Sequence, residues 1–152
     1  MVQKTVRLPV KRADHATDIP MPRYMTEGAS GMDIYAAIED EKTIMPHEIA
    51  IISTGLLVAV PPGYEIQIRP RSGLAAKQGI GILNSPGTID SDYRGEIKVI
   101  LINLSREPFI VKRSDRIAQM VLCPVSRAAI TESAELDSTG RSNGGFGHTG
   151  EH

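Results

Sequence analysis

Short segments that are apolar, or that alternate between apolar and polar residues, fill most of this 152-residue chain, with glycine and proline turns between them. In Tyr64–Arg69, for example, Ile66 and Ile68 face one way and the polar residues face the other. Two-residue alternation is typical of β-strands, and many short strands between frequent turns favour a sandwich, a jelly roll or a closed barrel. No long helices alternate with these segments, which disfavours a doubly wound α/β sheet. We therefore predict one all-β domain.

The expected elements follow from these patterns and from the turn residues between them. Ser72–Gln78 is the one persuasive helix: Ser72 is placed to cap it and Gly79 to end it, but about two turns cannot organise a fold. Gly55 is expected to separate two strands, and the charged run 39–42 to form a solvated loop. Strands are expected at residues 2–10, 33–37, 48–54, 56–60, 64–69, 97–104, 109–111 and 117–125.

Two of the expected strands, residues 97–104 and 117–125, are largely apolar on both faces. A small sandwich normally leaves one polar face on each strand. The excess apolar surface therefore suggests burial between subunits, and an unusually thick monomeric core is the alternative.

Composition limits the classes of partner and compartment. There are 17 Lys and Arg against 18 Asp and Glu, so the charge excess expected of a general nucleic-acid binder is missing. The single Cys123 reads as a buried free thiol, and the lack of an internal disulfide fits a reducing compartment. No apolar run approaches membrane-span length, and the basic, polar start has no secretion signal. We expect a soluble, cytoplasmic protein with no membrane or nucleic-acid partner.

The last fifteen residues, 138–152, differ from the rest because five of them are glycines. We expect a β-rich core at residues 1–137 and a flexible arm at 138–152. Such tails often do nothing specific. However, an arginine and an aromatic residue on a mobile strap, here Arg141 and Phe146, are suited to close over an anionic, aromatic ligand.

The stretch from Asn84 to Glu96 concentrates polar chemistry on what reads as a hairpin or loop. Pro86-Gly87 and the residues before Glu96 each suggest a turn. Between and beside these turns lie two aspartates, hydroxyls, a phenol and a guanidinium. This composition suits a pocket better than a core, and a solvated hairpin tip is the alternative.

Five segments resemble, in the right order, the five signature motifs of the trimeric dUTP pyrophosphatases (dUTPases). The third is complete, as Gly87, Ile89, Asp90, Tyr93, Arg94, Gly95 and Glu96. The others are GMDIYA at 31–36, with Ile34 where Leu is usual, RPRSGLA at 69–75, DRIAQM at 115–120 and RSNGGFGHTG at 141–150. The fifth departs from the family at Ser142, Asn143 and His148. One motif would be weak evidence, whereas five that span residues 31–150 are strong.

The resemblance implies a jelly-roll-like, distorted β-barrel subunit that assembles as a homotrimer, with each site built from all three chains. It implies hydrolysis of dUTP to dUMP and pyrophosphate by in-line attack of water on the α-phosphorus. It also implies Mg²⁺, held by triphosphate oxygens and waters rather than directly by protein ligands. The biological consequence would be less uracil in DNA and a supply of dUMP for thymidylate synthesis.

The resemblance implies that the third motif and its neighbours contact the base and the sugar of dUTP. Asn84 and the main chain around Gly87, Thr88 and Ile89 would pair with the uracil edge, which leaves the amino group of cytosine mismatched. Tyr93 would stack on the sugar and exclude a 2′-hydroxyl. Lys98 would border the pocket, with a solvated lysine as the alternative.

The remaining residues would handle the phosphates and the reaction. Asp90 would orient the attacking water and bond the 3′-hydroxyl, with Gln119 helping to orient phosphate or water. Asp33 would support the site from near the metal-bound waters, or brace a turn. The other phosphate and arm contacts would come from Arg71, Ser72 and Gly73, whose helix start suits phosphate oxygens, and from Arg141, Phe146, Gly147, His148 and Thr149.

Two alternative functions remain compatible with the sequence. The first is a dCTP deaminase of the same fold, or a bifunctional enzyme, although a deaminase needs a proton-shuttling acid beside the base. The second is a sensor that binds dUTP without turnover. The presence of Asp90 and of a complete arm disfavours both.

Overall fold

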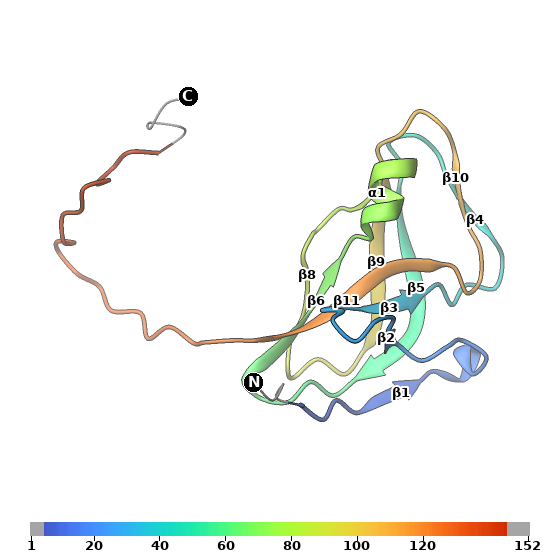
Figure 1. Ribbon diagram of the computed structural model, residues 1–152, viewed down its shortest axis with the longest axis horizontal. Coiled ribbons are helices and arrows are strands. Elements are labelled where there is room, and N and C mark those ends of the chain that lie inside the picture. Colours follow the sequence, from blue (N-terminus) through green and yellow to red (C-terminus); the bar gives the residue numbers. More distant parts are fainter. Residues whose placement is uncertain (1–4, 146–152) are drawn as a thin grey trace.

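A computed structural model describes residues 5–145 of the chain, and its regular secondary structure consists mainly of antiparallel strands. One sheet has the order β1-β5-β9-β7, a second has the order β2-β3-β11-β6-β8, and β10 pairs with β4 (Figure 1). The first sheet contains β1 (Val10–Arg12), β5 (Ile49–Val58), β9 (Glu96–Asn103) and β7 (Ile80–Ile82). The second contains β2 (Arg23–Tyr24), β3 (Met32–Tyr35), β11 (Arg116–Pro124), β6 (Tyr64–Arg69) and β8 (Gly87–Ile89). The small ribbon contains β10 (Phe109–Val111) and β4 (Lys42–Ile44).

The predicted fold class is confirmed: the chain has an all-β, jelly-roll-like fold with one α-helix among the described residues. That helix, α1, spans Ser72–Gln78 as expected and ends at Gly79, which is left-handed with φ 64°. The N-cap is Arg71 rather than Ser72, and it makes no side-chain capping bond. The prediction that Ser72 caps the helix is therefore wrong, because the helix begins at Ser72 itself.

The core lies between the two sheets and is filled by alternate strand residues. On the first sheet, Ile52 and Val99 point inwards, and on the second Ile66 and Met120 do so; all four belong to one buried cluster. The inward alternation of Ile66 and Ile68 on β6 is confirmed. Within the described residues, every buried side-chain nitrogen or oxygen has a hydrogen-bond partner.

Several predicted boundaries are wrong for reasons that involve long-range pairing. Gly55 does not separate two strands: β5 continues through it as a bulge, where the register with β9 shifts between Ser53 and Leu57. The first strand covers Val10–Arg12, whereas residues 5–9 are not in a strand. Lys42, expected in a loop, begins β4. The short strands β4, β7 and β8 exist because longer neighbours pair with them.

The outer face of the first sheet carries a second apolar row. Ile49 and Ile51 on β5 lie directly opposite Ile102 and Ile100 on β9. Their inner-face neighbours are buried, whereas Ile49 and Ile51 are 48% and 65% exposed. The apolar second face predicted for residues 97–104 is therefore present, and the described chain leaves it partly uncovered.

The chain leaves the packed body after β11. The amide of Val125 donates to the carbonyl of Gly63 at 2.9 Å, and beyond this bond the described segment stretches away from the sheets (Figure 1). Ile130 and Leu136 on this segment are 94% and 89% exposed. Cys123, expected to be buried, is half-buried near the end of β11. No helix in residues 5–145 has the length and hydropathy needed to cross a bilayer.

An ion pair joins the N-terminal segment to the turn between β10 and β11. Because of this pair, we expect the stability of the fold to decrease in acid. Arg113 donates to both carboxylate oxygens of Asp18, at 2.6 and 2.9 Å, and this hydrogen bonding lowers the pKa of Asp18 to about 2. Because the unfolded pKa is about 3.9, the pair stabilises the fold above that pH. The contribution is lost as the pH falls towards 2.

We expect Asp18→Asn to lower the urea midpoint of unfolding at pH 7 by a modest amount, since the pair is exposed. The difference from the original chain should vanish as the pH falls from about 4 to 2. Asp14→Asn is the matched control, because Asp14 has no ion pair with the described residues. A pH-independent difference for Asp18→Asn would contradict this account.

Candidate active site

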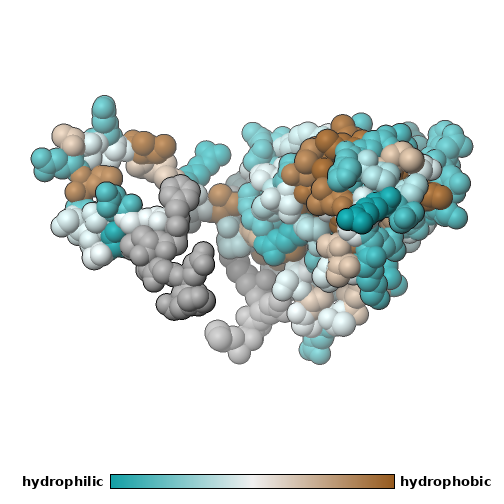
Figure 2. Space-filling view, turned by 90° about the horizontal axis from the view of Figure 1, so that it is seen from above, coloured by the Kyte–Doolittle hydropathy of each residue, from teal (hydrophilic) through white to brown (hydrophobic). Residues whose placement is uncertain are grey.

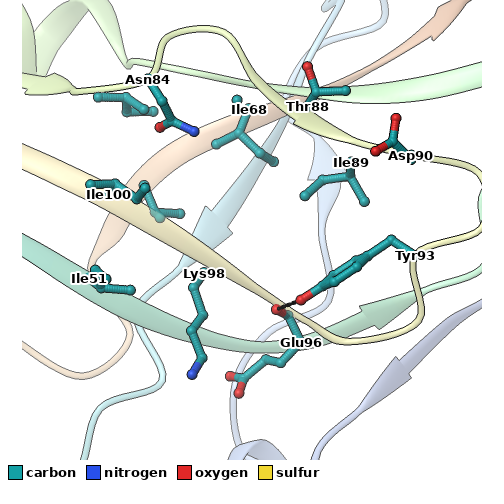
Figure 3. Close-up of a pocket in the computed structure, with 13 residues that line it drawn as sticks. Ile51, Ile68, Asn84, Thr88, Ile89, Asp90, Tyr93, Glu96, Lys98 and Ile100 are labelled. Carbon is teal, nitrogen blue, oxygen red and sulfur yellow. Dashed lines mark hydrogen bonds between the residues drawn. The ribbon is translucent and has the colours of Figure 1, made fainter.

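A cavity of about 290 Å³ opens between the edge strand β8 and the first sheet. Ile51, Ile68, Ile82 and Ile100 line it with apolar surface. Figure 3 shows the Asn84 amide pointing into this cavity and the Tyr93 ring reaching in from the opposite side. The polar lining consists of Asn84, Thr88, Asp90, Tyr93, Glu96 and Lys98. A flat, apolar-faced ligand with polar edges suits such a lining.

The edge position of β8 frees main-chain groups for a ligand. In the described residues β8 pairs only with β6, through Gly87, Thr88 and Ile89. Alternate residues of an edge strand direct their N–H and C=O groups away from the paired side. The Asn84 amide packs closely on Gly87, where a Cβ would lie 3.3 Å from Asn84 Nδ2 and 3.4 Å from Ile68 Cβ. The structure thus brings together Asn84 and the predicted base-contacting main chain.

The Tyr93 ring is fixed against the start of β9. Its hydroxyl donates to the main-chain oxygen of Glu96 at 3.0 Å (Figure 3). A Cβ at Gly95 would overlap the ring, so glycine is needed for this close approach. Lys98, two residues along β9, is exposed and lines the same cavity.

Asp90 follows β8 directly and lies on the rim of the cavity. Its main-chain oxygen accepts from the amide of Tyr93 at 3.2 Å, which closes the turn that leads from β8 towards β9. These two strands belong to different sheets and do not pair, so the expected hairpin is not formed and the segment is a loop between the sheets. The side chain is exposed, and within residues 5–145 its carboxylate has no ion pair or hydrogen bond. An unpaired carboxylate is available to accept a proton from water.

Asp33 belongs to a second group of predicted site residues, where it binds two arginines. Its carboxylate lies 3.3 Å from Arg71 Nε and 3.1 Å from Arg116 Nη1, and the side chain is 14% exposed. Arg71 Nη1 also donates to the main-chain oxygen of Arg116 at 3.0 Å. Two guanidinium groups share one carboxylate, so the cluster keeps a net positive charge suited to phosphate.

Gln119 lies beside this cluster, opposite Asp33 on β3 and Arg69 on β6. Gln119 Nε2 donates to the main-chain oxygen of Pro70 at 3.1 Å. Gly31 makes room for it, because a Cβ there would collide with the Gln119 amide. Ser72 and Gly73 are exposed at the start of α1, and the Ser72 hydroxyl has no hydrogen bond within the described residues.

One chain does not bring the two groups together. Asp90 follows Ile89, which pairs with Ile66, whereas Gln119 pairs with Arg69 further along β6. Moreover, β8 and β11 flank β6 on opposite sides. At about 3.3 Å per residue and 4.8 Å per strand, the backbone positions of Asp90 and Gln119 are roughly 16 Å apart across the sheet. They cannot orient the same water within one subunit.

The predicted arm residues fall at or beyond the end of the described chain. Arg141 Nε donates to the main-chain oxygen of Gly144 at 2.8 Å, on the segment that extends away from the body. Phe146, Gly147, His148 and Thr149 lie outside the described residues.

Sequence reasoning gave no site role to Arg116 or to the side chain of Glu96. Glu96 Oε1 accepts hydrogen bonds from the Ser53 hydroxyl and, at 2.7 Å, from the Gly55 amide. Partial burial acts to raise the pKa of Glu96, but these bonds outweigh it and hold that pKa below its ordinary value. Both residues lie within the motifs, which was the only signal in the sequence that pointed to them. Their partners lie on strands that are distant in the sequence.

Comparisons with known proteins identify the family. The dUTPase family model matches residues 17–150. A deoxyuridine 5'-triphosphate nucleotidohydrolase of Caldanaerobacter subterraneus subsp. tengcongensis is 56% identical over 96% of this chain and 99% of its own. The enzyme of the same name from Wolbachia pipientis wMel is 50% identical over 99% of both chains.

Solved structures give the same result. The Staphylococcus bacteriophage 80alpha dUTPase with dUPNHPP superimposes with a TM-score of 0.81 at 26% identity, over 96% of this chain and 99% of that one. The family model, the relatives and the fold therefore agree. The chain belongs to the dUTPase family.

Proposed function

We propose that this protein hydrolyses dUTP to dUMP and pyrophosphate, by in-line attack of water on the α-phosphorus and without a covalent intermediate. The observation that carries the proposal is the unpaired Asp90 carboxylate on the rim of a cavity whose lining suits a pyrimidine. Near full-length relatives named for this activity support it. Acting in the cytoplasm, where a single unpaired cysteine is stable, the enzyme would limit uracil in DNA and supply dUMP.

The cavity provides a physical basis for choosing uracil. The isoleucine side chains contact the faces of the ring, while the Asn84 amide and the free main-chain edge of β8 pair with O4 and N3. Cytosine would place its amino group against a donor, and an unpaired buried donor is costly. The tight turn beside this edge, at residues 83–86, would leave no room for the methyl group of thymine.

The sugar and the water occupy the end of the cavity beside the loop from Asp90 to Tyr93. Tyr93 stacks on the deoxyribose and excludes a 2′-hydroxyl, and Lys98 borders the pocket. Asp90 accepts a proton from the attacking water and bonds the 3′-hydroxyl. The water then needs only to be held in line with the leaving pyrophosphate.

The phosphates bind the second group of residues on another copy of the chain. Arg71 and Arg116, held by Asp33, present positive charge, and Gln119 contacts phosphate or water. The exposed Ser72 hydroxyl and the main chain at Gly73 bind oxygens around the bond that breaks. The roughly 16 Å between Asp90 and Gln119 in one chain supports assembly of each site from neighbouring subunits.

Mg²⁺ fits this arrangement as an ion bound mainly through the substrate. In residues 5–145 no cluster of three His, Cys, Asp or Glu side chains could hold a metal, and Asp33 already binds two arginines. Triphosphate oxygens and waters would be its ligands, with Asp33 in contact with those waters. When bound, the ion neutralises phosphate charge.

We further propose a homotrimer that buries Ile49 and Ile102, the part of the outer apolar row that does not line the cavity. Hydrophobic atoms gather in a patch on the body of the molecule (Figure 2). Ile49 is 48% exposed in the single chain and does not line the cavity, so it tests assembly separately from binding.

Ile49→Glu should shift the protein from trimer to monomer in sedimentation experiments. Fully burying an isoleucine contributes about 1.5–3 kcal/mol, and an unpaired buried carboxylate opposes association further. Ile110→Glu is the control, since Ile110 is similarly exposed, at 44%, but lies on the separate β10 ribbon. A stable trimer with glutamate at position 49 would mean that this row is not the interface.

The arm at residues 138–152 completes the site by closing over bound nucleotide. Arg141, His148 and Thr149 would hold the outer phosphates, with Phe146 stacked on uracil beside Gly147. Closure excludes bulk water and fixes the triphosphate in a reactive geometry.

The test of the function is pyrophosphate release from dUTP with Mg²⁺, compared with dCTP, dTTP and UTP. We expect rapid release from dUTP only, and loss of activity with excess chelator that added Mg²⁺ restores. Ammonia release from dCTP would instead identify the deaminase. Tight dUTP binding with no pyrophosphate would identify the sensor.

A further inference from the structure

Glu96 connects the loop that follows β8 to the bulge in β5 of the first sheet. Its main-chain oxygen accepts from the Tyr93 hydroxyl at 3.0 Å. Its carboxylate accepts from the Ser53 hydroxyl and from the Gly55 amide at 2.7 Å, and the side chain is 21% exposed. One residue therefore contacts both the Tyr93 ring and the β5 bulge.

The conformation of the β5 bulge places the Gly55 amide next to the Glu96 carboxylate. Gly55 has φ +65°, and a Cβ there would collide with Ala16 in the 3-10 turn η1 (Asp14–Ala16). On the other side of the bulge, the buried Thr54 hydroxyl donates to the main-chain oxygen of Ile97 at 2.6 Å. The start of β9 is thus bonded to β5 by two adjacent residues, Glu96 and Ile97.

These bonds act on the end of the cavity that holds Tyr93. Glu96 itself lines the cavity, and Figure 3 shows its carboxylate directed away from the apolar floor, towards the same side as the Lys98 amine. His15 Nε2 lies 3.5 Å from the carboxylate, at the surface. The position of the Tyr93 hydroxyl depends on where the Glu96 main chain is held.

We propose that Glu96 is a positioning residue: its carboxylate, bound by Ser53 and the Gly55 amide, fixes the start of β9 and thereby holds Tyr93 where it excludes a ribose 2′-hydroxyl. This inference rests on the proposed function for the role of Tyr93. The contacts themselves do not depend on any nucleotide. We call the contacts of the Glu96 carboxylate with Ser53 and Gly55 the clamp. Loosening the clamp should lower the discrimination between dUTP and UTP more than it affects other steps.

The kinetic experiment compares kcat/KM for dUTP and UTP in four variants. Glu96→Ala should lower the dUTP-to-UTP ratio about tenfold, equivalent to about 1.4 kcal/mol. Ser53→Ala, which keeps the carboxylate, should give a smaller loss, and Glu96→Gln should restore most of the ratio because it keeps an acceptor oxygen. Glu48→Ala is the matched control: Glu48 Oε2 accepts from the Met45 amide at 2.8 Å at the far end of β5.

A second measurement needs no nucleotide. Hydrogen exchange of a peptide covering residues 90–96 should accelerate in Glu96→Ala and Ser53→Ala and stay unchanged in Glu48→Ala. Unchanged exchange in both would overturn the clamp, even if the enzyme hydrolyses dUTP as proposed. Faster exchange with an unchanged dUTP-to-UTP ratio would overturn the positioning role. Failure of the original protein to hydrolyse dUTP would instead overturn the proposed function. The hydrogen-exchange result would then still show whether the clamp holds residues 90–96.

Discussion

Asp90→Asn should abolish most turnover of dUTP while leaving nucleotide binding measurable. Removing a positioned general base typically costs about 10²–10⁴ in rate. Asparagine keeps the shape and can still bond the 3′-hydroxyl, but it cannot accept the proton of the attacking water. Pyrophosphate release gives kcat, and calorimetric titration with a non-hydrolysable dUTP analogue gives the affinity.

Asp92→Asn is the matched control for this variant. Asp92 is an exposed carboxylate on the same turn, two residues further on, and it does not line the cavity. It should retain near-normal kcat. If Asp90→Asn turned over dUTP as fast as the original enzyme, the assigned base would be wrong. If it lost binding as well, Asp90 would act mainly in holding the nucleotide.

Deletion of residues 138–152 should leave a folded protein with little activity. In the described part of this segment, residues 138–145, every side chain is exposed or half-buried and none joins the core. The urea midpoint should therefore not change. Without the arm the site stays open to water and loses Arg141, and a misplaced substrate alone can lower the rate about 10²-fold.

The control for this deletion is a chain in which residues 138–152 are replaced by a glycine-serine linker of equal length. It keeps the bulk and flexibility of the arm but removes its side chains, so it should be as inactive as the deletion. The activity of Arg141→Ala in the full chain should lie between that of the original protein and that of the deletion. Normal hydrolysis by the truncated protein would show that the arm does not close the site.

The sequence alone determined the features that depend on neighbouring residues. Tyr64–Arg69, Ser72–Gln78 and Phe109–Val111 were predicted to the residue, because alternation, helix propensity and turn residues are local signals. The dUTPase family was identifiable for a similar reason, since each motif is a short run whose spacing survives without knowledge of the fold.

Only the tertiary structure decided which distant residues meet. The continuity of β5 through Gly55 and the strands β4, β7 and β8 depend on partners far along the chain, as do the contacts of Arg116 with Asp33 and of Glu96 with Ser53. Periodicity cannot reveal such pairings, because hydrogen bonds and packing between strands depend on register, which is set by the whole sheet. The same register places Asp90 and Gln119 apart, which the order of the motifs did not indicate.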